Sequence, residues 1–123
     1  MNDLEVGLKM LGYHKNPYPF YRKADLYVCS SYFEGYSTSC VEAIYFGLPV
    51  LTTRCAGMDE ILNSGKFGMI VDNTTDALCN GLECILSNRS LIEKYKGNIL
   101  KIIEWSIRWM SIIICLTLKE RIK

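Results

Sequence analysis

An α/β fold organised around a parallel sheet is the fold class that three features of this sequence predict. Short apolar runs near residues 26–29, 50–53 and 67–71 have the length and composition of buried strands. Segments with apolar residues at helical spacing follow the first and the third of these runs. Gly, Ser, Thr or Asn stands at the junctions. Strand and helix alternating in this way is typical of βαβ units, in which the strands run parallel.

The segment at residues 34–53 has the clearest βαβ features. The hydroxyl residues 37–39 are predicted to start a helix, because such side chains accept hydrogen bonds from the free N–H groups of a first turn. Ser39 with Glu42 also fits the S-x-x-E capping box. Gly47 stands where a left-handed residue ends a helix. A strand is then expected to follow at once.

Two carboxylates in this segment indicate a binding site. Glu34 lies in the turn and Glu42 in the first turns of the helix, so both can face one crevice. In parallel α/β sheets, ligands bind beyond the carboxyl ends of the strands, where helix N-termini offer unpaired N–H groups. These amides suit a diphosphate, while carboxylates accept hydrogen bonds from sugar hydroxyls. The combination therefore indicates a nucleotide-sugar site.

Each of these residues also has a plain structural explanation. Taken alone, Glu42 is better explained as a capping-box partner, and Glu34 as a solvated loop acid. Gly35 and Gly47 are common turn residues. These alternatives stay open for each position taken singly. The order and spacing of the whole set favour a shared site.

Residues 34–62, EGYSTSCVEAIYFGLPVLTTRCAGMDEIL, resemble the E-x7-E segment of family 4 glycosyltransferases, which are retaining enzymes with the GT-B fold. The matching positions are Glu34, Gly35, Glu42, Ala43, Gly47, Pro49, Val50, Gly57 and Glu60. The resemblance extends over about residues 11–86. It implies a partial Rossmann-like parallel sheet, the C-terminal half of a GT-B enzyme, truncated, over residues 1–98. An extra apolar C-terminal helix of uncertain packing is expected over residues 99–123.

The resemblance implies a donor-binding role for six residues: Glu34, Gly35, Tyr36, Ser37, Thr38 and Glu42. In the family, the first carboxylate and the turn amides hold the transferred sugar, the next amides hold the diphosphate, and the second carboxylate holds the ribose hydroxyls. Glu34 is also the one candidate for a catalytic role. Gly57 and Glu60 are expected to shape the pocket. For Glu60, an acid that complements a helix dipole is an equally good explanation.

The function that the resemblance implies is transfer of a hexosyl group from a nucleotide-diphosphate sugar to an acceptor hydroxyl, with retention of configuration. Cell-envelope or exopolysaccharide synthesis is the expected setting, and neither a cofactor nor a metal is expected. The alternative is a non-catalytic module that binds nucleotide sugars or another protein. Because the family's N-terminal domain and its phosphate-binding Arg and Lys have no counterpart here, weak or absent transfer by the chain alone is predicted.

Composition narrows the expected partners. The net charge of +1 gives no general attraction to nucleic acid. The six cysteines show no C-x2-C pairing, which favours a reducing cytoplasm over a disulfide framework or a zinc site. The family resemblance, and not the composition, implies the other partners: a nucleotide sugar, a glycan or lipid-linked acceptor, and a separate polypeptide with the N-terminal GT-B half.

The two ends of the chain are harder to assign. Residues 1–12 are expected to contain a strand that ends at Leu11 and Gly12. The uncharged run at residues 109–118 is about half as long as a membrane-spanning helix requires. Three explanations of this apolar tail stay open: a helix that has lost its partner surface, a helix lying on the inner face of the membrane, and an altered reading frame after about Trp105.

Overall fold

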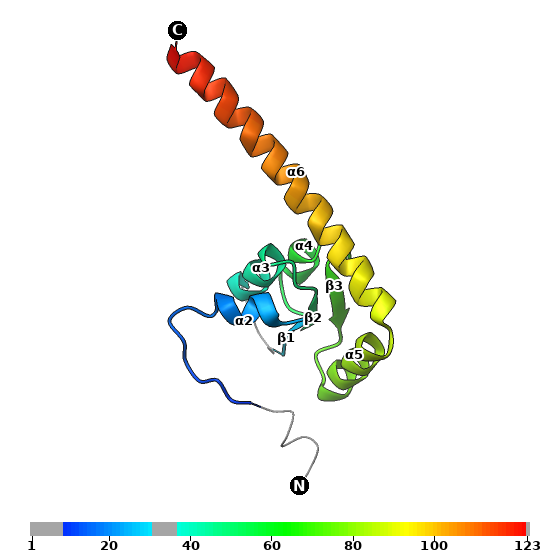
Figure 1. Cartoon of the computed structure of the whole chain (residues 1–123). Helices are drawn as coiled ribbons and strands as arrows, with labels where there is room; N and C mark the ends of the chain where they lie inside the picture. The colour runs from blue at the N-terminus through cyan, green and yellow to red at the C-terminus, as the bar shows by residue number, and fades with distance from the viewer. Residues whose placement is uncertain (1–8, 31–36, 123) are drawn as a thin grey trace.

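The computed structural model describes residues 9–30 and 37–122, with side chains as far as Arg108. Its helices and strands follow one another along the chain in the order α2 (Tyr18–Lys23), β1 (Tyr27–Cys29), α3 (Thr38–Tyr45), β2 (Val50–Thr53), α4 (Met58–Ile61), β3 (Gly68–Val71), α5 (Thr75–Ser87) and α6 (Arg89–Ile122). The three strands form one parallel sheet in the order β1-β2-β3 (Figure 1). The predicted alternation of parallel strands and helices is confirmed.

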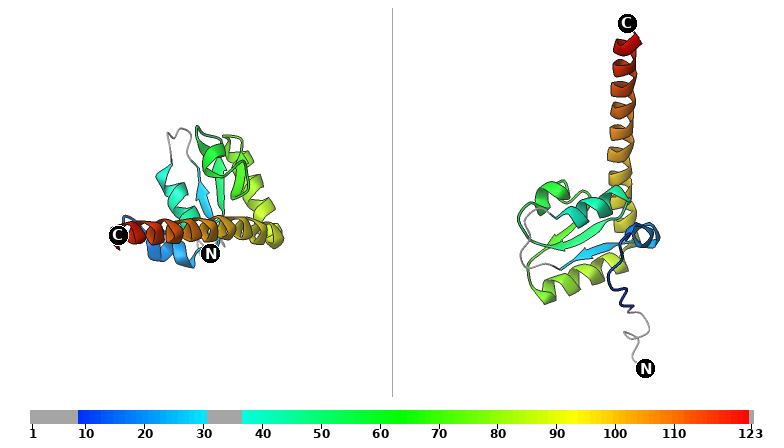
Figure 2. Two further views of the ribbon diagram at one scale, coloured as in Figure 1. Left: turned by 90° about the horizontal axis from the view of Figure 1, so that it is seen from above. Right: turned by 90° about the vertical axis from the view of Figure 1, so that its left-hand side faces the viewer.

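The sheet is covered by helices on both faces. Figure 2 shows α3 and α4 on one side of the strands and α5 on the other. All four residues of β2, the central strand, are buried. On the side of α3 and α4, one apolar core joins these helices to the sheet and to α6; its buried members are Cys29, Cys40, Ala43, Leu48, Val50, Met58, Ile61, Leu62, Phe67 and Ile99.

The opposite face depends on a close approach at Gly81 in α5. A Cβ atom at Gly81 would lie 2.9 Å from Val71 Cγ1 and 3.1 Å from Leu51 Cδ1. The helix therefore lies almost directly on β2 and β3 at this point. The apolar spacing of this segment in the sequence predicts that Ile85 and Leu86 are both core positions. Ile85 is fully buried, whereas Leu86 is 62% exposed, so the prediction for Leu86 is wrong.

Helix α3 begins where the hydroxyl cluster predicts, but its cap differs from one prediction. Ser37 is the N-cap, and its Oγ accepts a hydrogen bond of 3.4 Å from the Cys40 N–H. The proposed capping box of Ser39 and Glu42 is therefore wrong, because both residues already lie inside the helix. Gly47 has the expected left-handed conformation, with φ of +79°. Strand β2 follows three residues later.

Strand β1 is less buried than its apolar sequence predicts. Cys29 is buried, whereas Val28 is 41% exposed. Val28 is opposite Leu51 in the register and shares its face of the sheet. Helix α5 packs on β2 and β3 and leaves this part of β1 uncovered. A strand buried on both sides was predicted, and the structure buries only one side.

The N-terminal segment differs from its prediction where it can be compared. The first eight residues lie outside the described part, and residues 9–12 form no strand, so the strand expected to end at Gly12 is absent there. The Asn-Pro pair at residues 16–17 predicts a helix with Asn16 as its cap and Pro17 as its first residue. In the short helix α2, Asn16 Oδ1 accepts a hydrogen bond of 3.3 Å from the Tyr18 N–H. Pro17 is the N-cap residue, one position before the helical start expected for it.

Helix α6 is one continuous helix of 34 residues. Its first half packs on the domain through Ile99, which is fully buried, and through Tyr95. The Asn98 side-chain amide donates a hydrogen bond of 2.9 Å to the Lys66 carbonyl. The second half runs away from the sheet into open space (Figure 1). The helix continues through residue 98 without a break. The division of the chain into a unit of residues 1–98 and a unit of residues 99–123 stays a prediction.

No helix in the described part of the chain has the length and hydropathy that a bilayer-spanning segment requires.

Candidate donor-binding site

The N-terminus of α3 lies at the carboxyl edge of the sheet, where parallel α/β folds bind ligands. Ser37 is 2% exposed, and its side chain is engaged in capping the helix. Thr38, the first helical residue, is exposed. In this first turn the Cys40 N–H donates to Ser37 Oγ, and binding of an anion by the other amides stays a prediction. The other predicted donor residues in this turn, Glu34, Gly35 and Tyr36, lie outside the described residues.

Glu42 lies in the second turn of α3 and is half-buried. Phe46, one turn further along the same face, is stacked with Tyr18 of α2 at a ring-centroid distance of 5.0 Å. Tyr21 contacts the same ring at 5.8 Å. Burial, followed by the phenol of Tyr27 and the charge of Glu42, raises the pKa of Tyr21 above its usual value. Glu42 therefore belongs to the face of α3 that α2 covers.

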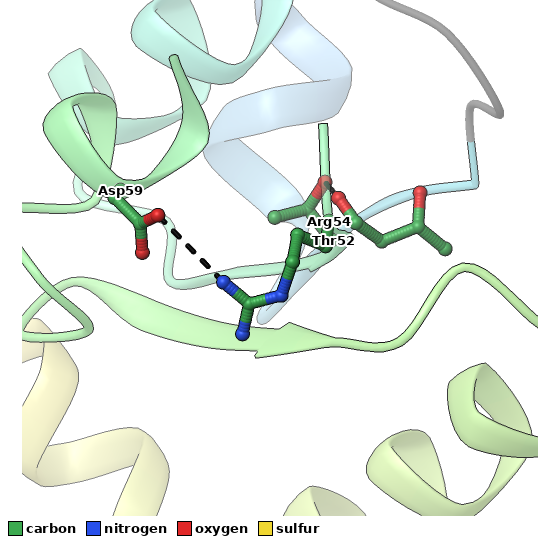
Figure 3. A network of polar contacts seen from close by, with 4 residues as sticks. Thr52, Arg54 and Asp59 are labelled. Carbon is green, nitrogen blue, oxygen red and sulfur yellow. Dashed lines mark hydrogen bonds and ion pairs between the residues drawn. The ribbon is translucent and has the colours of Figure 1, made fainter. Parts of the chain in front are cut away.

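The pocket-shaping residues lie at the start of α4. Gly57 is its N-cap and has a left-handed φ of +83°, which explains why glycine is present there. Glu60 is exposed in the first helical turn, a position that complements the helix dipole. Neighbouring Asp59 forms an ion pair of 3.7 Å with Arg54, which follows β2 (Figure 3). The pocket-shaping role of Gly57 and Glu60 stays a prediction.

A hollow of about 270 Å³ opens at the carboxyl ends of the strands. It is lined by Ser30, Thr53, Asn73, Thr74, Thr75 and Leu78. The sequence predicts that Ser30, a small residue after the first strand, lets a ligand approach, whereas it predicts only a helix-capping role for residues 73–75. Thr74 does cap α5, since its Oγ1 accepts a hydrogen bond of 3.1 Å from Ala77. The carboxyl ends of parallel strands lie at one edge of a sheet. This rule could have identified residues 73–75, which follow the third strand, as part of the site from the sequence alone.

The carboxyl edge carries hydroxyl groups after β1, in β2 and at the start of α5, and the carboxylate of Glu42 lies in the second turn of α3. Hydroxyl and amide groups can exchange hydrogen bonds with a sugar, and a carboxylate accepts from hydroxyls. Within the described residues, no cluster of three or more His, Cys, Asp or Glu side chains is arranged to hold a metal ion. The expectation that the donor chemistry needs neither metal nor cofactor stays a prediction.

Comparison with known families decides the class of the protein. The family model described as "Glycosyl transferases group 1" matches residues 2–101. The chain belongs to this family. The finding agrees with the resemblance at residues 34–62, and the match covers every residue predicted to bind the donor.

Relatives of this group 1 domain have glycosyltransferase names. It is 28% identical over 97 residues to N-acetylgalactosamine-N,N'-diacetylbacillosaminyl-diphospho-undecaprenol 4-alpha-N-acetylgalactosaminyltransferase of Campylobacter jejuni, covering 77% of this chain and 27% of that protein. It is 38% identical over 52 residues to a D-inositol 3-phosphate glycosyltransferase of Corynebacterium jeikeium, and this match covers 42% of this chain and 12% of that protein.

Among solved structures, the group 1 domain resembles sucrose-phosphate synthase from Thermosynechococcus elongatus. The TM-score is 0.63 at 22% sequence identity, over 83% of this chain and 26% of that one. This likeness confirms the fold prediction, a Rossmann-like parallel sheet of a GT-B glycosyltransferase. The chain spans about a quarter of the length of the synthase and of the Campylobacter relative.

Proposed function

We propose that this group 1 domain binds the nucleotide-diphosphate sugar of a retaining, family 4 hexosyltransferase. The donor diphosphate lies at the N-terminus of α3, the ribose hydroxyls bond to Glu42, and the transferred sugar lies at the turn with Glu34. The acceptor hydroxyl attacks the anomeric carbon, and the nucleoside diphosphate leaves. Charge develops on the leaving diphosphate, so helix-terminal amides there lower the barrier.

The observation that carries this proposal is the position of α3. Its capped N-terminus opens at the carboxyl edge of a parallel sheet, and Glu42 lies one turn behind it on a half-buried face. The hydroxyl-lined hollow occupies the same edge. Anion-binding amides with sugar-binding oxygens nearby match the two parts of a nucleotide sugar.

For the acceptor, we propose a glycan or a lipid-linked saccharide used in building the cell envelope. The name of the Campylobacter relative describes transfer to a diphospho-undecaprenol-linked saccharide. A cytoplasmic domain that meets the inner face of the membrane would suit such an acceptor, because its saccharide is anchored to the bilayer. Helix α6, which extends away from the domain, is available for contact with that surface or with an N-terminal GT-B half.

A binding module without turnover is the second candidate. Arg54, the cation that follows β2 at the carboxyl edge, is paired with Asp59 at 3.7 Å. The loss of one donor to an oxyanion typically costs about 3 kcal/mol of transition-state stabilisation. Because the phosphate-binding Arg and Lys of the family have no counterpart in this sequence, we expect the 123-residue chain to bind donors but to transfer sugar weakly or not at all.

Calorimetric titration with UDP-sugars and GDP-sugars tests the proposal. Glu42→Ala is the test variant, and Glu93→Ala, an exposed acid on α6, is the matched control. Saturable binding to one donor, weakened about tenfold or more by Glu42→Ala alone, is expected from the loss of a charged hydrogen bond. Equal affinity in all three proteins would contradict the role of Glu42, and the absence of binding by the folded chain would contradict donor binding itself.

A further inference from the structure

Helix α2 covers the face of α3 that carries Glu42 through a cluster of aromatic rings. Tyr18 and Phe46 are stacked with their planes 26° apart. The ring centroid of Tyr21 lies 5.8 Å from that of Phe46 and 5.8 Å from that of Tyr27. The ring planes of Tyr21 and Tyr27 are nearly perpendicular. Tyr21 thus joins α2 to both α3 and β1. Aromatic pairs in such arrangements contribute about 0.5 to 1.5 kcal/mol each beyond the area that they bury.

The ring of Tyr21 packs against the apolar core, next to the helical turn of Glu42. Tyr21 is half-buried and contacts the core cluster that includes Cys40 and Ala43 of α3. Glu42 and Phe46 are four positions apart, so they are neighbours on the helix surface. A ring that is fixed on Phe46 therefore limits the movement of the helical face from which the Glu42 side chain extends.

The electrostatics agree with this proximity. The negative charge of Glu42 is one of the groups that raise the pKa of Tyr21, after burial and the phenol of Tyr27; Tyr18 and Cys40 contribute in the same direction. The guanidinium of Arg22 is the cation near these rings, 5.8 Å from the centre of the Phe46 ring.

We propose that Tyr21 is a positioning residue for Glu42, and that its ring, packed between Phe46 and Tyr27, holds the Glu42 face of α3 in the orientation that binds the donor. This inference rests on the proposed donor-binding function. The residue acts through the ring and not through its hydroxyl, so phenylalanine is expected to replace it.

The proximity of the two residues is tested without any ligand. The protein is labelled with 13C at the tyrosine Cζ, and the titration of Tyr21 is followed by NMR. In Glu42→Gln, the Tyr21 pKa is expected to fall towards its ordinary value, whereas in Glu60→Gln, which changes an exposed acid on α4, it is expected to stay unchanged. An unchanged Tyr21 pKa in Glu42→Gln overturns the proposal.

The positioning role is tested by donor affinity in a double-mutant cycle. Tyr21→Ala is expected to weaken donor binding about tenfold in the wild-type background and to have no further effect in Glu42→Ala. Tyr21→Phe should restore wild-type affinity. A merely structural role predicts instead that Tyr21→Ala lowers the melting temperature and leaves the affinity of the folded protein unchanged.

Two controls separate the possible failures. Phe20→Ala removes an α2 ring that contacts His14 at 4.8 Å and lies outside the contact with Phe46, so it should leave donor affinity unchanged. If Tyr21→Ala does not fold, Tyr21→Leu replaces it in the cycle. A wild-type chain that binds no donor refutes the proposed function, and a wild-type chain that binds donor with equal effects of Tyr21→Ala in both backgrounds refutes only the positioning role.

Discussion

Gly68 in β3 and Val50 in β2 approach each other so closely that a Cβ atom on Gly68 would lie 1.8 Å from the Val50 carbonyl oxygen. The two residues are directly opposite in the parallel register. The obstructing atoms belong to the backbone of the central strand, so they cannot rotate away as a flexible side chain would. Glycine is therefore required at position 68 if β3 is to pair with β2 in this register.

Gly68→Ala should lower the free energy of unfolding by about 3 kcal/mol, the upper part of the range for an overpacked core. Urea denaturation measures this change. Gly97→Ala is the matched control, because a Cβ at Gly97 of α6 would meet no atom within 4 Å. That substitution should raise stability by up to about 1 kcal/mol, since alanine favours a helix interior. Equal effects of the two substitutions would show that the close approach is not a constraint.

The cap of α3 distinguishes two interpretations of the same sequence. Ser37→Ala should destabilise the protein by about 1 kcal/mol, because the Cys40 N–H loses its acceptor at a buried site. Ser39→Ala lies inside the helix and should be neutral or slightly stabilising. Thermal unfolding of both variants measures the difference. A greater loss in Ser39→Ala would restore the capping box with Glu42.

Local signals were sufficient to predict much of the fold around the candidate site. The hydroxyl cluster, Gly47 and the apolar run after Pro49 each act within a few residues, and they correctly placed α3 and β2. The capping-box prediction was wrong because Ser37 and Ser39 could each start the helix. The spacing in the sequence does not show which of the two serines is the N-cap. Exposure of Val28 was not predictable, since it depends on which strands α5 covers.

The contact between α5 and the sheet leaves no space for a larger residue at Gly81. Gly81→Leu should cost about 2 kcal/mol, because its side chain would displace Val71, Leu51 and Met69. Asn80→Leu, at the exposed preceding position, is the control and should change stability by less than about 0.5 kcal/mol. Chemical denaturation measures both. If Gly81→Leu is as stable as the control, α5 does not pack as closely as the structure shows.

Alkaline pH should destabilise the protein in part through Tyr95. Burial, followed by the charge of Cys84, raises the pKa of Tyr95, whose side chain on α6 is 7% exposed. The folded state therefore holds this proton more tightly than the unfolded state, so the contribution is complete below about pH 10 and is lost as the pH rises through the folded pKa.

Tyr95→Phe should remove this part of the loss, so its stability should fall less steeply than that of the wild type above about pH 10. The pKa of Tyr21 is also raised, so the stability of Tyr95→Phe should still fall somewhat with rising pH in this range. Tyr45→Phe is the control, because Tyr45 is 76% exposed. Urea denaturation at a series of pH values measures the slopes. Parallel curves for the wild type and Tyr95→Phe would contradict the assignment.

The candidate site was predictable in its position but not in its extent. The carboxylate spacing and the resemblance led to α3, and α3 does open at the carboxyl edge of the sheet. Residues 73–75 were missed as part of that edge because their capping role fully explained them in the sequence. The continuity of α6 from Arg89 was also missed, since its apolar composition changes within a single helix.

The most direct test of the account is an NMR titration of the 15N-labelled chain with the nucleotide sugar that binds in calorimetry. The amides of Ser37, Thr38 and Ser39 at the N-terminus of α3 are predicted to shift most strongly and to saturate with the calorimetric affinity. The amides of residues 93–96 on α6, which do not line the hollow at this edge, serve as the internal comparison. Saturable shifts confined to α5 or α6, with the α3 amides unchanged, would contradict donor binding at this site.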